Sequence, residues 1–188
     1  MAKPLRLFAL PLLVAAAMPA QTESSREVLT LGTLEDGVYH HNRTCIQFAV
    51  PSGWVIVTEG TSSSGGQAVT LRDAETNFTA TVWMKARKVD PADIPALMDR
   101  RLDDKAAQRN NFQGYTYRAD SVQHTTIGGQ PALSAVADYQ RTGQHMVESL
   151  TWVEGEKSRV VFVGRVPASD LTDFQGRFDE VIRSVVVP

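Results

Sequence analysis

Apolar and polar residues alternate with a period of two through much of this chain, which is typical of half-buried β-strands. The clearest case is segment 78–86, "FTATVWMKA", in which every second residue from Phe78 to Ala86 is apolar. The same alternation turns the intervening residues, Trp83 among them, to the opposite face of the strand. Further strands are predicted at 46–50, 54–60, 67–73, 133–139 and 146–152.

The segment 48–57, "FAVPSGWVIV", combines two apolar runs with a Pro-Ser-Gly bend between them. Proline lacks an amide donor and glycine tolerates positive φ, so both residues interrupt a strand. The pattern therefore predicts a strand, a tight bend at 51–53, and a second strand that begins with Trp54.

The period changes to three or four residues at Pro91, and charged residues lie between the apolar positions. This spacing predicts an amphipathic helix over 91–108, with Asp90 as its cap before a first-turn proline. A second helix is predicted from about Ser169, which is a favourable N-cap residue. Its apolar stripe consists of Leu171, Phe174, Phe178, Ile182 and Val185.

The order of these elements predicts an α+β domain. Long consecutive strands follow the first helix and are separated by Gly-Gly, Thr-Gly and Glu-Gly-Glu-Lys turns, the spacing of an antiparallel meander. We therefore expect an antiparallel sheet of about six to eight strands, covered by a central and a C-terminal helix.

The first twenty residues have the features of a secretory signal peptide. Lys3 and Arg6 precede an uncharged apolar run that is too short for a transmembrane helix. Small residues allow cleavage after Ala17 or Ala20. We expect a signal peptide at 1–20, a mobile lead-in at 21–27, and one α+β domain at 28–188 that is periplasmic or secreted and has no transmembrane segment after cleavage.

Charge and cysteine content narrow the functional classes. Loss of two bases with the signal leaves 17 bases against 21 acids, a formal net charge of −4 that argues against nucleic acid as a partner. Cys45 is the only cysteine, so an internal disulfide is impossible. The run 100–105, "RRLDDK", alternates bases and acids and predicts exposed ion pairs along the first helix.

No catalytic or metal-binding motif stands out. His40 and His41 are adjacent and point to opposite faces of a strand, so neither they nor Cys45 predicts a metal site. His124 and His145 lie among polar residues, which is typical of solvated histidines. Neither a Gly-x-Ser-x-Gly nucleophile turn nor a phosphate-binding Gly-Lys-Ser/Thr motif is present. We therefore predict no catalytic residue, no cofactor and no metal.

Three segments together resemble the PsbP-like superfamily: "FAVPSGW", "IGGQPA" before a long hairpin, and a final "F-x-x-x-F-x-x-V-I-x-S" helix. The resemblance covers about 44–186. It implies an exported or membrane-peripheral binding or assembly protein of the bacterial envelope. It also implies that Trp54 fills the core beneath the last helix, against Phe174, Phe178 and Ile182.

The "GGQPA" hairpin is also similar to the C-terminal segments of some exported zinc metallopeptidases. Such enzymes need an H-E-x-x-H motif to hold zinc and activate water, and this chain has none. An accessory domain related to those segments therefore stays open, without the hydrolytic activity.

Two functional hypotheses follow. The first is a non-catalytic envelope module that binds a protein partner or a small apolar ligand through one side of the sheet. The alternative is an enzyme whose site is too dispersed to recognise. Trp83 is the candidate partner contact for the binding module. It is either covered by a helix or loop, or exposed as an aromatic residue of the type enriched at interfaces, and only the exposed case makes it a contact.

Overall fold

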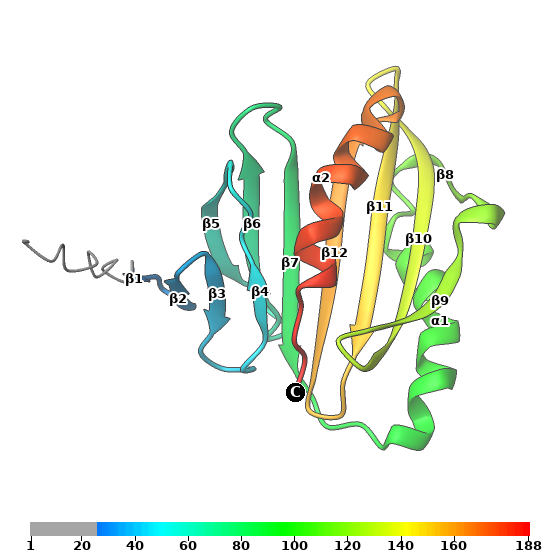
Figure 1. The fold of residues 1–188 in the computed structure, drawn as a ribbon. Helices are drawn as coiled ribbons and strands as arrows, with labels where there is room; N and C mark the ends of the chain where they lie inside the picture. The colour runs from blue at the N-terminus through cyan, green and yellow to red at the C-terminus, as the bar shows by residue number, and fades with distance from the viewer. Residues whose placement is uncertain (1–25) are drawn as a thin grey trace, which may run out of the picture.

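The structure, a computed structural model, describes residues 26–188 (Figure 1). The predicted signal peptide lies outside these residues. Within them, the helices are α1 (Ile94–Gln108) and α2 (Leu171–Arg183). The strands are β1 (Arg26–Val28), β2 (Gly32–Glu35), β3 (Val38–His41), β4 (Gln47–Ala49), β5 (Trp54–Thr61), β6 (Gln67–Asp73), β7 (Thr79–Ala86), β8 (Gln113–Tyr117), β9 (Gln123–Ile127), β10 (Gln130–Arg141), β11 (Gln144–Glu154) and β12 (Ser158–Pro167).

The α+β prediction is confirmed. One antiparallel sheet has eight strands in the order β5-β6-β7-β12-β11-β10-β8, with β9 also paired to β10. The first four strands form a separate antiparallel sheet, β1-β2-β3-β4, of which the sequence predicted only the strand at 46–50. The chain leaves this small sheet at the bend before Trp54, where Pro51 offers no amide and Gly53 has a φ of +87°.

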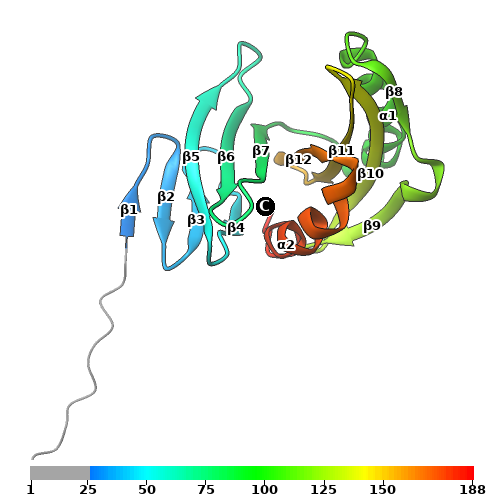
Figure 2. The same cartoon turned by 90° about the horizontal axis from the view of Figure 1, so that it is seen from above.

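The two helices lie on opposite sides of β12, β11 and β10 (Figure 2). The small sheet is on the same side as α2, and a bridge between Gln47 and Val186 joins β4 to the segment after α2. On the other side, α1 packs through Ile94 and Met98 against Leu133, Leu150 and Trp152. Each face of the large sheet therefore has its own apolar cluster.

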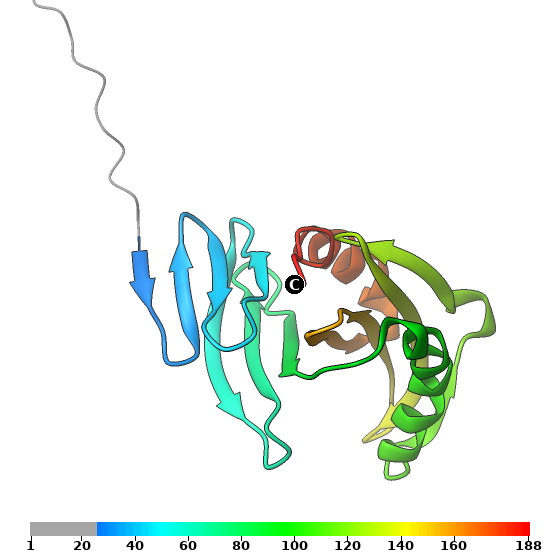
Figure 3. The same cartoon turned by 90° about the horizontal axis from the view of Figure 1, so that it is seen from below.

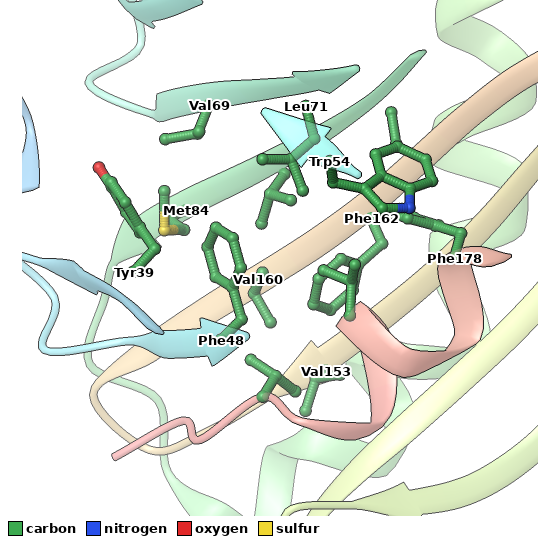
Figure 4. Close-up of a cluster of buried hydrophobic side chains, with 14 of the residues drawn as sticks. Tyr39, Phe48, Trp54, Val69, Leu71, Met84, Val153, Val160, Phe162 and Phe178 are labelled. Atoms are coloured by element: carbon green, nitrogen blue, oxygen red, sulfur yellow. The ribbon is translucent and has the colours of Figure 1, made fainter. Parts of the chain in front are cut away.

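The cluster on the α2 side is rich in aromatic residues (Figure 4). Trp54 is buried and its ring lies 5.6 Å from that of Phe178, while Phe174 lies 5.2 Å from Phe178. Ile182 is partly buried against the same cluster. Gly164 of β12 allows the close approach of α2, because a Cβ at this position would lie 2.0 Å from the Phe174 ring.

The two helices begin differently. The carboxylate of Asp90 accepts a hydrogen bond of 2.9 Å from the amide of Ala92, in the short 3-10 turn that precedes α1. The prediction of Ser169 as N-cap of α2 is wrong, because Ser169 lies within a 3-10 turn and its hydroxyl donates to Asp170 instead. Asp170 occupies the N-cap position and makes no side-chain capping bond. Between residues 26 and 188, no helix is long and apolar enough to cross a membrane.

Candidate functional site

A groove of about 500 Å³ lies on the α1 side of the large sheet. Figure 3 shows α1 and the β5–β6 hairpin on either side of β7. The hairpin loop forms one wall and is closed by a hydrogen bond of 2.7 Å from the Ser62 amide to the Gly66 carbonyl. The second wall is the side of α1 that carries Arg101 and Lys105, together with Arg109 at the C-cap of this helix. Helix α1 thus covers only part of this face and leaves the groove open beside it.

The floor of the groove alternates between apolar and basic side chains because it is built from one face of β7, β11 and β12. β12 contributes Arg159, Val161, Val163 and Arg165, which recur at every second position. Trp152 of β11 lies beside Val161 in the strand register and is buried.

Trp83 lies on this floor, between Ala68 of β6 and Val161 of β12 in the strand register. Its side chain is 39% exposed, whereas Trp54 and Trp152 are 6% and 4% exposed. The sequence left open whether Trp83 is covered or exposed, and in the structure it is exposed. Its role as a partner contact stays a prediction.

Glu148 of β11 is fully buried beneath one end of the groove. It accepts hydrogen bonds from Nη2 of Arg109 at 2.8 Å, from Nε of Arg165 at 2.9 Å and from the hydroxyl of Tyr115 at 2.7 Å. Burial alone would raise the pKa of Glu148, but these donors and the charge of Lys105 hold it below its usual range. Glu148 therefore stays ionised and fixes the positions of two arginines.

Glu154, at the end of the same strand, is the second buried carboxylate. Arg101 donates to it from Nε at 2.8 Å and Arg87 from Nη1 at 3.2 Å, and Nη1 of Arg159 lies 4.0 Å away. The predicted ion pairs within 100–105 are therefore wrong for Arg101, which pairs with the sheet because the helix turns this residue toward β11.

Lys105 lies between these two clusters and has no carboxylate within 4.0 Å of its ammonium among residues 26–188. Burial lowers its pKa to about 8, and the charges of Arg109, Arg165 and Arg159 act in the same direction against the opposing charge of Glu148. Six basic side chains line the groove against one carboxylate, Asp104. When the buried Glu148 and Glu154 are counted with Asp104, six basic groups face three carboxylates.

The other candidates from the sequence lie outside the groove. His41 is buried, its Nδ1 lies 2.6 Å from the Thr44 hydroxyl, and burial lowers its pKa. Cys45 is exposed, and so is His145, which pairs with Asp138 at 2.7 Å. Within the described part of the chain, no group of three or more His, Cys, Asp or Glu side chains could hold a metal.

Sequence reasoning missed the two glutamates and their arginines, although a signal was present. Glu148 and Glu154 share the period of two with Leu150 and Trp152, so they occupy inward positions of the strand. A carboxylate at an inward position needs cationic partners. Arg101 and Lys105 of α1 and its C-cap residue Arg109 recur at a spacing of four, which places them on one side of the helix.

No protein-family model and no curated protein matches the chain. Several solved structures are similar to it, among them the following three. LpqN, involved in cell envelope biogenesis of Mycobacterium tuberculosis, has a TM-score of 0.54 at 16% identity over 79% of this chain and 88% of that one. PsbP of the cyanobacterium Synechocystis has a TM-score of 0.56 at 15% identity over 80% and 91%.

The third structure is a Pseudomonas aeruginosa protein of unknown function, PA94, with a TM-score of 0.51 at 14% identity over 88% of this chain and 96% of that one. At such low identities these likenesses concern the fold. The chain has a PsbP-like fold, as its sequence segments predicted.

Proposed function

We propose that this chain is an exported, non-catalytic binding module of the bacterial envelope, and that its binding site is the groove beside α1. The observation that carries the proposal is an exposed tryptophan in a concave site whose positive charge is only partly neutralised. The volume of about 500 Å³ is in the range of small-ligand sites, roughly 300–1,000 Å³. An exposed indole is also the side chain most enriched at binding hot spots.

Export is supported by the cationic start, apolar run and small residues of segment 1–20. The LpqN structure adds a protein of similar fold that is involved in cell envelope biogenesis. The acidic net charge of the chain argues against nucleic acid as the ligand of its basic groove.

The non-catalytic assignment is supported by how the two buried glutamates are held. A general base needs a pKa near the working pH, whereas the donors around Glu148 hold its pKa low. An accessory domain of a larger exported enzyme would use the groove in the same way, so that hypothesis is a special case of this one.

Lys105 is the one observation that favours the enzymatic alternative, since burial lowers its pKa to about 8. A catalytic lysine of the Schiff-base type would be trapped as a covalent adduct by borohydride in the presence of a small aldehyde, faster than other lysines of the chain. We expect the adduct, because the lowered pKa leaves more of the Lys105 amine uncharged, but no conversion of the aldehyde, because Lys105 has no carboxylate within 4.0 Å among residues 26–188 to act as a base.

The test of the binding site compares three forms of the mature protein purified from its own envelope. Native mass spectrometry of the wild type should detect bound material that Trp83→Ala loses. Val186→Ala is the control, because Val186 is 54% exposed and lies on the α2 side. The proposal fails if Trp83→Ala retains the bound material, or if the wild type carries none.

A further inference from the structure

The basic side chains of the groove retain donors that nothing in the fold uses. Arg109 and Arg165 bond to Glu148 through Nε and Nη2, so their Nη1 groups have no partner among the described residues. The guanidinium of Arg159 makes no hydrogen bond there either, and its nearest carboxylate, Glu154, lies 4.0 Å away. Together with Lys105, the groove thus holds four cationic groups with unused donors beside one apolar floor.

Such an arrangement is costly unless something occupies it. A buried or half-buried cation loses hydration and regains it only through an anionic or hydrogen-bonding partner. Each cluster has three basic groups around one glutamate: Lys105, Arg109 and Arg165 at Glu148, and Arg87, Arg101 and Arg159 at Glu154. One carboxylate cannot neutralise three cations. Asp104 adds one acid near Arg159, so two positive charges are left over at Glu148 and one at Glu154.

We infer that the groove binds an organic oxyanion, with its carboxylate or phosphate group at Lys105 and Arg165 and its apolar body over Val163 and Val161 toward Trp83. This inference rests on the proposed function and names the chemistry of its ligand. Guanidinium forks match the planar or tetrahedral oxygens of these groups in geometry as well as charge.

The apolar part of the ligand is assigned from the floor. Val161 and Val163 lie between Arg159 and Arg165 on β12, and Trp83 presents its exposed indole beside Val161. A ligand whose charge lies against Lys105 and Arg165 therefore places its body over the valines and toward the indole. A volume of about 500 Å³ leaves room for a body of one or two rings rather than a folded protein segment.

Lys105 also couples binding to proton uptake. Its pKa is about 8 in the free protein because burial and three arginines disfavour the charged form. An anion beside the ammonium favours the charged form and raises that pKa. At pH 8.5 the free protein is partly deprotonated at Lys105, so binding of the anion should take up a proton.

The experiment uses rigid probes that share one body: 2-naphthyl phosphate, 2-naphthoate and the uncharged 2-naphthol, with inorganic phosphate as the fourth probe. Calorimetry at pH 7 should give the two anions an affinity about tenfold or more above that of 2-naphthol. The stronger of the two anions identifies the headgroup as phosphate or carboxylate. Inorganic phosphate should bind more weakly than 2-naphthyl phosphate, because it lacks the body.

At pH 8.5, repeating the titration in two buffers of different ionisation enthalpy measures the proton uptake. Lys105→Met should lose about tenfold in affinity for the anions and lose the uptake, while its affinity for 2-naphthol is unchanged. Lys88→Met is the matched control, since Lys88 is exposed and outside the groove. Thermal melting of both variants shows that each is folded.

The inference is overturned if 2-naphthol binds as tightly as the anions, or if a folded Lys105→Met keeps its affinity for them. The inference alone fails if none of the naphthyl probes binds while material from the envelope still depends on Trp83. The proposed function fails together with the inference if Trp83→Ala still binds the naphthyl anions and still retains the material from the envelope.

Discussion

The two faces of the eight-stranded sheet are built on opposite principles. The face under α2 and the small sheet has a continuous cluster of 22 buried apolar residues, with aromatic rings stacked from β5, β12 and α2. The face under α1 has a cluster of eight and, beside it, two buried glutamates held by arginines. Apolar burial is the main favourable contribution to folding, so most of the stability comes from the α2 face.

Strand β12 illustrates the difference within a single element. Its residues Val160 and Phe162 are fully buried on the α2 side, while Arg159 and Arg165 border the groove on the other side. A strand that is buried on both faces of a sheet has apolar residues on both faces. The polar face of β12 therefore indicates a surface that was left accessible, and substitutions on the two faces should separate stability from binding.

The largest expected effect is that of Trp54→Ala on the α2 face. Truncation of a buried aromatic residue costs about 3–5 kcal/mol, out of roughly 5–15 for a typical domain. Trp54 is 6% exposed and contacts Phe178, so urea unfolding should give a loss in this range. Unchanged stability with lost binding would make Trp54 a contact residue and would undo the contrast between the faces.

The second prediction concerns the charged part of the α1 face. Glu148→Gln removes the carboxylate shared by Arg109 and Arg165, and breaking a buried pair in this way should cost about 3 kcal/mol. Glu156→Gln, at an exposed position, is the control and should have no effect in the same urea titrations. Equal stabilities of the two variants would show that the Arg–Glu clusters do not contribute to folding.

The same variant has a pH signature. The pKa of Glu148 is lower in the folded than in the unfolded protein, so its contribution is present above its unfolded pKa and is lost as pH falls through the folded value. Wild type should therefore lose more stability than Glu148→Gln on acidification from pH 5 to pH 2. Parallel curves for the two proteins would contradict this assignment.

The contrast between the faces could be predicted only in part from the sequence. The alternation in 78–86 and the helical spacing in 91–108 depend on neighbouring residues, and both elements have the predicted faces. The four-stranded sheet and the Arg–Glu clusters depend on pairing between distant segments. Glu154 contacts Arg87 and Arg101, which lie 67 and 53 residues away, and no local pattern specifies such partners.

The third prediction follows Lys105 through its titration. Its pKa is about 8 in the folded protein against 10.5 for an unperturbed lysine, so between these values the unfolded chain binds more protons. Stability should therefore rise with pH in this window, by on the order of 1–2 kcal/mol after allowance for partial exposure. Lys105→Met should lack this rise, and the difference between the two proteins isolates it from other titrations. A difference that does not vary between pH 8 and 10.5 would place Lys105 in solvent.

The smallest effect on stability and the clearest spectroscopic one are expected from Trp83 on the α1 face. It is the only one of the three tryptophans with substantial exposure, and basic side chains surround it. Iodide should therefore quench part of the fluorescence more strongly than a neutral quencher does, and added chloride should weaken this quenching by screening. Trp83→Ala should remove the quenchable part and change stability by about 1 kcal/mol or less, because the indole lies at the edge of the covered surface. Trp54→Ala should do the reverse, with iodide quenching kept and stability lost. If instead Trp83 emits at short wavelength, resists iodide, and destabilises the fold when removed, then the α1 face is as closed as the α2 face and the groove is not a binding site.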